Sequence, residues 1–174
     1  ATHGLAWLAT YVEALKQLHG YAGRLRDAGS FGETEDLTVR LAFAEYLAQI
    51  FGGIPMNQGE TVRLADLGLP PREAAEFLVP EIEALIASGN TPEVRARLTA
   101  LIRQQEGASV FGATGLDETY EQVREEMRRF AADKVLPHAH EWHLKNDYIP
   151  LEIITQMAEL GVFGLTIPED FGGL

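Results

Sequence analysis

The chain has 174 residues, 46% hydrophobic and 23% charged, with a formal net charge of −12. This balance is typical of a soluble globular protein and excludes an intrinsically disordered one. The acidic charge and the absence of a cluster of lysine and arginine argue against nucleic-acid binding.

The sequence contains no cysteine. Disulfides, thiolate metal sites and cysteine nucleophiles are therefore excluded, and a reducing cytoplasm suits such a chain. No apolar run approaches the ~20 residues that span a bilayer. The N-terminus lacks the basic flank and apolar core of a secretory signal. We therefore expect a cytoplasmic protein that does not enter a membrane.

Two long helices are predicted first. Apolar residues at helical spacing predict one over residues 5–25, with an apolar face so wide that most of its sides should be covered. Thr34 is the predicted N-cap of the next helix, whose apolar stripe runs to Phe51. Gly52 and Gly53 should end that helix.

Shorter elements follow. Residues 54–69 show no sustained period, so we predict a long connection and no strand. Residues 70–71, both proline, open a helical stretch that Pro80 must kink or split. The clearest local signal predicts a helix over residues 91–107, which Thr91 caps.

Residues 107–115 are rich in glycine and small side chains, and this composition indicates a linker. We therefore predict an all-α chain in three parts. They are a helical N-terminal module (residues 1–106), a linker (107–116) and a second helical region (117–174).

The second helical region should contain two amphipathic helices and an extended tail. Asp117 or Thr119 caps the first helix, which Pro137 limits, and the second opens at Pro150 and ends at Gly161. Two helices are too few to close a core of their own. The sequence stops just after a Gly-Gly turn signal, so we expect it to be the first part of a longer protein.

The histidine-rich stretch at residues 138–143 is the most suggestive candidate for a metal site. Zinc needs three or four converging ligands. On one helix, His138 and His143 lie about 140° apart, whereas His140 and His143 lie about 60° apart. Two histidines, not three, then share a face, so we interpret the stretch as a polar surface near a helix end.

The remaining candidates also favour structural roles. His19 lies on the apolar face of the first helix, as core or interface histidines do. Trp7, Tyr11 and Phe51 have the helical spacing of core residues. We therefore assign no catalytic, cofactor-binding or metal-binding residue to this chain.

The C-terminal third of the chain carries a set of residues whose order along the sequence forms a specific composite pattern. They are Phe130, Val135, Pro137, Ala139, Pro150, Glu152, Leu160-Gly161, Gly164-Leu165, Ile167-Pro168-Glu169 and Phe171-Gly172-Gly173. In this order they resemble the opening helices of the acyl-CoA dehydrogenase family. Phe171 departs mildly from the pattern, since tyrosine is common there. The pattern gives Glu152 and Glu169 helix-start and turn roles.

The resemblance implies an architecture for the parent protein: an α-helical domain, a β-barrel domain and a helical bundle that together hold FAD and an acyl-CoA. In this family a carboxylate removes the α-proton while the flavin accepts a hydride from the β-carbon. Electrons usually pass to an electron-transferring flavoprotein, and homodimers or homotetramers are usual. The family's flavin and catalytic motifs lie beyond residue 174, so this chain alone should bind no FAD.

The long N-terminal extension resembles that of a member acting on a branched dicarboxylic acyl-CoA. Two alternatives remain open at this point. One is an acyl-CoA oxidase or flavin monooxygenase of the same fold, and the other is a non-enzymatic helical interaction module.

Overall fold

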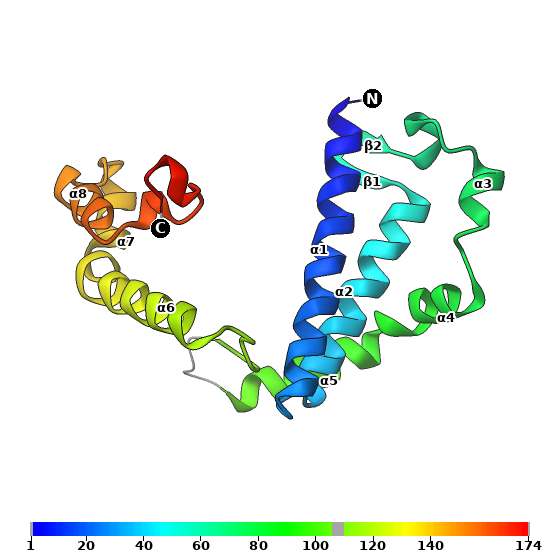
Figure 1. Ribbon diagram of the computed structural model, residues 1–174, viewed down its shortest axis with the longest axis horizontal. Helices are drawn as coiled ribbons and strands as arrows, with labels where there is room; N and C mark the ends of the chain where they lie inside the picture. The colour runs from blue at the N-terminus through cyan, green and yellow to red at the C-terminus, as the bar shows by residue number, and fades with distance from the viewer. Residues whose placement is uncertain (1, 106–109, 174) are drawn as a thin grey trace. The chain divides into compact units, whose positions relative to one another are not determined.

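The computed structural model describes residues 2–105 and 110–173, and it divides into two compact units, residues 1–115 and 116–174 (Figure 1). Within the described residues, helices dominate and the strands are confined to one two-stranded sheet. The predicted all-α fold class is therefore confirmed.

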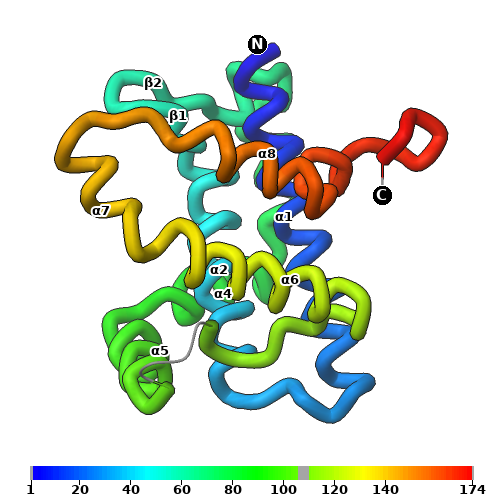
Figure 2. The backbone as a smooth tube through the Cα atoms, turned by 90° about the vertical axis from the view of Figure 1, so that its left-hand side faces the viewer, coloured from blue at the N-terminus to red at the C-terminus, as the bar shows by residue number. Residues whose placement is uncertain are grey.

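The first unit is built on two long helices, α1 (Thr2–Asp27) and α2 (Glu33–Gly52). They run side by side in opposite directions, as Figures 1 and 2 both show. The apolar side chains buried along them are small or branched, which allows close approach. They are Leu15, Ala22 and Leu25 of α1 and Leu37 and Ala44 of α2.

The prediction that Thr34 caps α2 is wrong, because the helix starts at Glu33 and its N-cap is Gly32, two residues earlier than predicted. The carboxylate of Glu35 reaches back and accepts a hydrogen bond from the Gly32 N–H at 2.9 Å. An acid at the third helical position satisfies the unpaired N–H group in this way. The predicted stop at Gly52 and Gly53 is confirmed.

The prediction of no strand over residues 54–69 is also wrong. Strands β1 (Ile54–Asn57) and β2 (Glu60–Val62) form an antiparallel hairpin, with Ile54 opposite Val62. Asn57 shapes the turn, since its side-chain oxygen accepts a hydrogen bond from the Gly59 N–H at 2.9 Å. Strands of four and three residues are too short to show an alternating period.

Three further helices complete the first unit: α3 (Pro71–Ala75), α4 (Pro80–Gly89) and α5 (Pro92–Gln104). Helices α4 and α5 pack against α2. Pro80 splits the helical stretch, as predicted. The hydroxyl of Thr91 accepts a hydrogen bond from the Val94 N–H at 3.3 Å, so the predicted cap is confirmed. The predicted end of α5 at Gly107 lies outside the described residues.

The second unit begins with α6 (Glu118–Phe130), whose N-cap is Asp117. The prediction that Pro137 limits this helix is wrong. The helix passes through a π-helical turn (Ala131–Val135) into α7 (Leu136–Lys145). Proline has no N–H to donate and its ring crowds the preceding turn. The wider π turn, with the Leu136 N–H bonded to the Ala131 carbonyl, accommodates it.

The second unit continues with α8 (Leu151–Glu159) and two short 3-10 turns, Val162–Gly164 and Glu169–Phe171. Among its described residues, Ile153 is the buried apolar side chain. Large apolar side chains such as Leu151 and Phe171 are 72% and 81% exposed. No helix in the described parts of the chain is long and apolar enough to cross a membrane.

Candidate functional site

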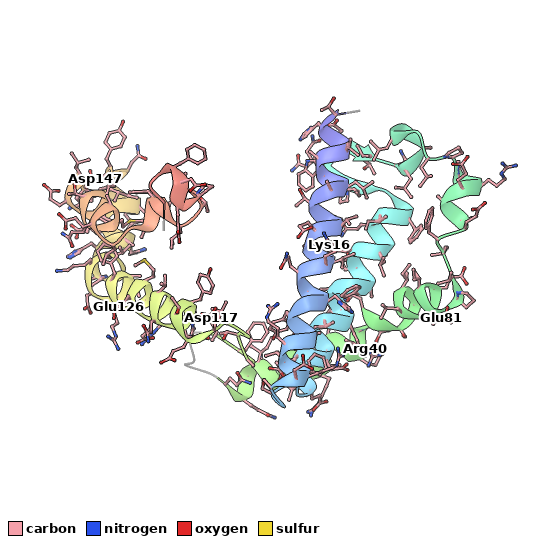
Figure 3. The ribbon with its side chains drawn as sticks, viewed as in Figure 1. Lys16, Arg40, Glu81, Asp117, Glu126 and Asp147 are labelled. Carbon is pink, nitrogen blue, oxygen red and sulfur yellow. The ribbon has the colours of Figure 1, made fainter. Side chains whose placement is uncertain are left out.

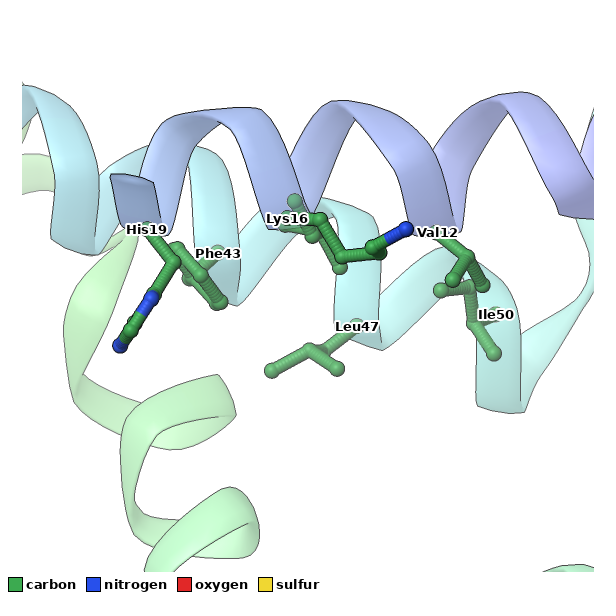
Figure 4. Close-up of a pocket in the computed structure, with 7 residues that line it drawn as sticks. Val12, Lys16, His19, Phe43, Leu47 and Ile50 are labelled. Atoms are coloured by element: carbon green, nitrogen blue, oxygen red, sulfur yellow. The ribbon is translucent and has the colours of Figure 1, made fainter. Parts of the chain in front are cut away.

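The first unit carries an apolar groove of about 540 Å³ between α1 and α2. Figure 4 shows that both α1 and α2 contribute side chains to it. The lining residues are Val12, Leu15, Lys16 and His19 of α1 and Phe43, Leu47 and Ile50 of α2. The local sequence explains the groove, because α2 carries a second set of apolar residues, Phe43, Leu47 and Ile50, which its neighbours α1, α4 and α5 cover only in part.

The polar groups at the groove are poorly suited to catalysis. The Lys16 ammonium pairs with the Glu13 carboxylate at 2.7 Å, and this hydrogen bond, together with that from Gln17, lowers the pKa of Glu13. The positive charge of Lys16 at the groove is therefore already paired with a carboxylate. His19 lies exposed at the groove edge rather than in the core, with no acid among the lining residues to act with it. The groove can hold an apolar group but offers no acid–base pair.

A chain of polar side chains joins α1, α2 and the end of α4. The Tyr11 hydroxyl donates to the Gln49 side-chain oxygen at 2.6 Å, and the Gln49 amide donates to Glu45 at 2.6 Å. The Asn90 amide donates to the other Glu45 oxygen at 2.6 Å. Burial, the Tyr46 ring and the Glu45 charge raise the pKa of Tyr11. Tyr11 therefore keeps its proton and acts as a structural donor.

The other aromatic candidates of the first unit are Trp7, which lies beside Tyr11, and Phe51. The rings of Trp7 and Tyr11 meet edge to face with centroids 6.3 Å apart, and the Trp7 indole donates to His3 at 3.1 Å. Both rings are partly exposed, as is Phe51. They belong to the periphery of the helix packing rather than to its centre.

The histidine-rich stretch forms the exposed surface of α7. His138 packs on Trp142 with ring centroids 5.6 Å apart, while His140 and His143 are exposed. Glu141 pairs with Lys145 along the helix. In the described parts of the chain, no group of three metal-ligating side chains comes together.

A shallow hollow of about 450 Å³ lies on the second unit, lined by residues of the π turn, α7 and the start of α8. Its polar lining side chains include Asp133, Lys134, His138 and Glu152. Glu152 lies in the first turn of α8, and Glu169 opens a 3-10 turn. Both acids therefore occupy element starts, where a carboxylate is favoured by the helix dipole.

The sequence analysis missed the groove because it assigned one apolar stripe to α2. Phe43, Leu47 and Ile50 lie off that stripe. The available signal was this second set of apolar residues at helical spacing, which requires more covering than one neighbouring helix provides.

Residues 117–174 match the family model of the acyl-CoA dehydrogenase N-terminal domain. The resemblance drawn from the Phe130–Gly173 pattern is therefore confirmed, and the chain is similar to acyl-CoA dehydrogenases.

One curated relative is similar over nearly the whole chain. It is (2S)-methylsuccinyl-CoA dehydrogenase of Cereibacter sphaeroides, 54% identical over 173 residues, which cover 99% of this chain and 31% of the relative. Two others match over shorter stretches. Glutaryl-CoA dehydrogenase of Desulfococcus multivorans is 36% identical over 58 residues, 33% of this chain and 15% of the relative. Mitochondrial isobutyryl-CoA dehydrogenase of Dictyostelium discoideum is 36% identical over 61 residues, 35% of this chain and 14% of the relative.

The chain spans less than a third of the length of each of these relatives. The similarity to the methylsuccinyl-CoA dehydrogenase includes the first unit, because 173 of the 174 residues are matched. The other two matches are about the length of the second unit alone.

Proposed function

We propose that this chain is the N-terminal part of an FAD-dependent acyl-CoA dehydrogenase that oxidises (2S)-methylsuccinyl-CoA to mesaconyl-CoA. The observation that carries the proposal is the 54% identity over 99% of the chain to a methylsuccinyl-CoA dehydrogenase. That match includes the helical first unit, whereas the other two relatives match over only about 60 residues.

The described residues do not fit FAD. Its pyrophosphate needs cations or backbone N–H groups turned toward a shared site. The larger groove is apolar, and its ammonium group, Lys16, is already paired with Glu13. We therefore assign FAD binding and the proton and hydride transfers to the parts of the protein beyond this chain.

For the first unit we propose an accessory role in substrate choice or assembly. Its groove is apolar, and the Tyr11 hydroxyl and the Glu45 carboxylate are engaged in hydrogen bonds between elements. Such features suit packing rather than proton transfer. We further propose a cytoplasmic homodimer or homotetramer that passes electrons to an electron-transferring flavoprotein.

Steady-state oxidation by the full-length protein tests this proposal. With a flavoprotein or dye as electron acceptor, kcat/KM should be highest for (2S)-methylsuccinyl-CoA, compared with glutaryl-CoA and isobutyryl-CoA. Oxygen consumption without an added acceptor would instead favour an oxidase or monooxygenase. The absence of turnover with all three thioesters would favour a non-enzymatic helical module.

A further inference from the structure

The connecting segment, residues 110–115, is bound to the first unit by hydrogen bonds at several points. The Gly112 N–H donates to the Gln105 side chain at 3.1 Å, and the Ala113 N–H donates to Glu35 at 2.7 Å. These contacts tie down a segment whose glycine-rich composition would by itself allow a flexible linker.

Glu35 is the centre of this arrangement. It is only 6% exposed, although a carboxylate is rarely buried unless its oxygens are bonded. One oxygen accepts from the Gly32 N–H at the start of α2, and the other accepts from the Ala113 N–H. A single side chain therefore caps α2 and holds the connecting segment.

Gly112 makes room for that carboxylate. Its φ of +73° favours glycine, and a Cβ at this position would lie 2.7 Å from a Glu35 oxygen and 3.4 Å from Thr34. The backbone can approach Glu35 this closely only because residue 112 has no side chain.

The far end of the segment is held by α1. The Tyr21 hydroxyl donates to the Ala113 carbonyl at 2.7 Å, and the Arg24 guanidinium donates to the Gly115 carbonyl at 3.3 Å. Burial and the nearby Glu35 charge raise the pKa of Tyr21, so its hydroxyl keeps the proton that it donates.

We propose that Glu35 and Gly112 form a latch that fastens residues 110–115 to the first unit as a fixed strap. The observation that supports this proposal is the buried Glu35 carboxylate, which accepts hydrogen bonds both from the N-cap of α2 and from the strap. Hinge motion within the strap would have to break this latch, and breaking it would also loosen the start of α2. The inference does not depend on the dehydrogenase activity.

Amide hydrogen exchange in the complete chain, read residue by residue, tests the latch. Glu35→Gln leaves the shape but replaces one acceptor oxygen by an NH₂ group, so one of the two N–H bonds is lost. Gly112→Ala brings a Cβ against Glu35. Gly112→Ala should speed exchange at Ala113 by roughly tenfold or more, and Glu35→Gln should do so at whichever of Gly32 and Ala113 loses its acceptor, the effect of losing a buried hydrogen bond to a charged group.

Gly29→Ala is the matched control. Gly29 also has positive φ (+66°), but a Cβ there would meet nothing within 4 Å, so the backbone strain is similar and the clash is absent. Exchange at Ala113 should stay within about twofold of the parent chain. Tyr21→Phe, which removes one hydroxyl and no ring contact, should speed exchange across residues 113–115 even if Gly112→Ala fails to fold.

Two results would overturn the latch. One is exchange at Ala113 in the parent chain as fast as in an unstructured peptide. The other is exchange at both Gly32 and Ala113 in Glu35→Gln, and at Ala113 in Tyr21→Phe, that equals exchange in the Gly29→Ala control.

Discussion

At the scale of single residues, the surface of α6 shows how charge spacing organises a helix. Glu125 pairs with Arg128 at 2.8 Å and with Arg129 at 3.2 Å, at i+3 and i+4 spacing. The hydrogen bond from Arg128, with the charges of both arginines, lowers the pKa of Glu125 to about 2. Figure 3 shows the charged side chains of this helix, with Glu126 and the N-cap Asp117 labelled.

The depressed pKa predicts a pH dependence. Because the folded-state pKa is below the ordinary value of 4.5, the ion pairs stabilise α6 above about pH 4.5. That stabilisation is lost as the pH falls through about 2. An NMR titration of the Glu125 carboxyl in the parent chain should therefore show a midpoint well below 4.5.

Arg128→Gln removes the main cause of the low pKa of Glu125, so the titration midpoint of Glu125 should rise toward 4.5. Arg124→Gln is the control, because Arg124 pairs with Glu121 at 2.8 Å. An equal shift of the Glu125 midpoint in both variants would show that general charge, not the specific pairing, sets this pKa.

At the scale of elements, the contact between α2 and α4 depends on Gly89. A Cβ at Gly89 would lie 2.7 Å from the Ala44 Cβ and 2.8 Å from the Arg40 carbonyl oxygen. Gly89→Ala should therefore lower the free energy of unfolding by about 1–3 kcal/mol, since the two helices must move apart. Chemical unfolding followed by circular dichroism measures this change.

Gly23→Ala provides a control, for which we expect the free energy of unfolding to change in the opposite direction. Gly23 lies inside α1, and a Cβ there would meet nothing within 4 Å. Alanine should raise the free energy of unfolding by about 0.5–1 kcal/mol, because glycine weakens a helix interior. A loss of stability in Gly23→Ala, or none in Gly89→Ala, would contradict this account of the packing.

The elements that the sequence predicts well have local causes. Thr91 caps α5 through a neighbouring N–H, and Pro80 splits a helix by its own geometry. The predictions that are wrong fail because they depend on contacts that neither one apolar stripe nor one residue reveals. Gly32 caps α2 only because Glu35 reaches back to it, and the helix passes Pro137 by widening into a π turn. The groove is formed by two helices together, so the apolar stripe predicted for α2 alone does not reveal it.

At the scale of the whole molecule, the two units differ in how much apolar surface they bury. In the described residues, buried apolar side chains lie mostly in the first unit, and Ile153 is the one in the second. Amide exchange in the 174-residue chain should therefore be faster over residues 117–173 than over 2–105. Equal protection in both ranges would show that the second unit is stabilised by contacts that its own packing does not provide.

The central claim is that this chain belongs to a flavin-dependent dehydrogenase of methylsuccinyl-CoA. The most direct test follows the flavin absorbance of the full-length protein, without oxygen, when (2S)-methylsuccinyl-CoA is added in a rapid-mixing instrument. We predict a yellow protein whose flavin is bleached by this thioester, and whose bleaching persists in His19→Ala because His19 is exposed and has no acid beside it among the residues that line the groove. The isolated 174-residue chain should quench no FAD fluorescence. A colourless full-length protein, or a flavin that methylsuccinyl-CoA does not reduce, would contradict the claim.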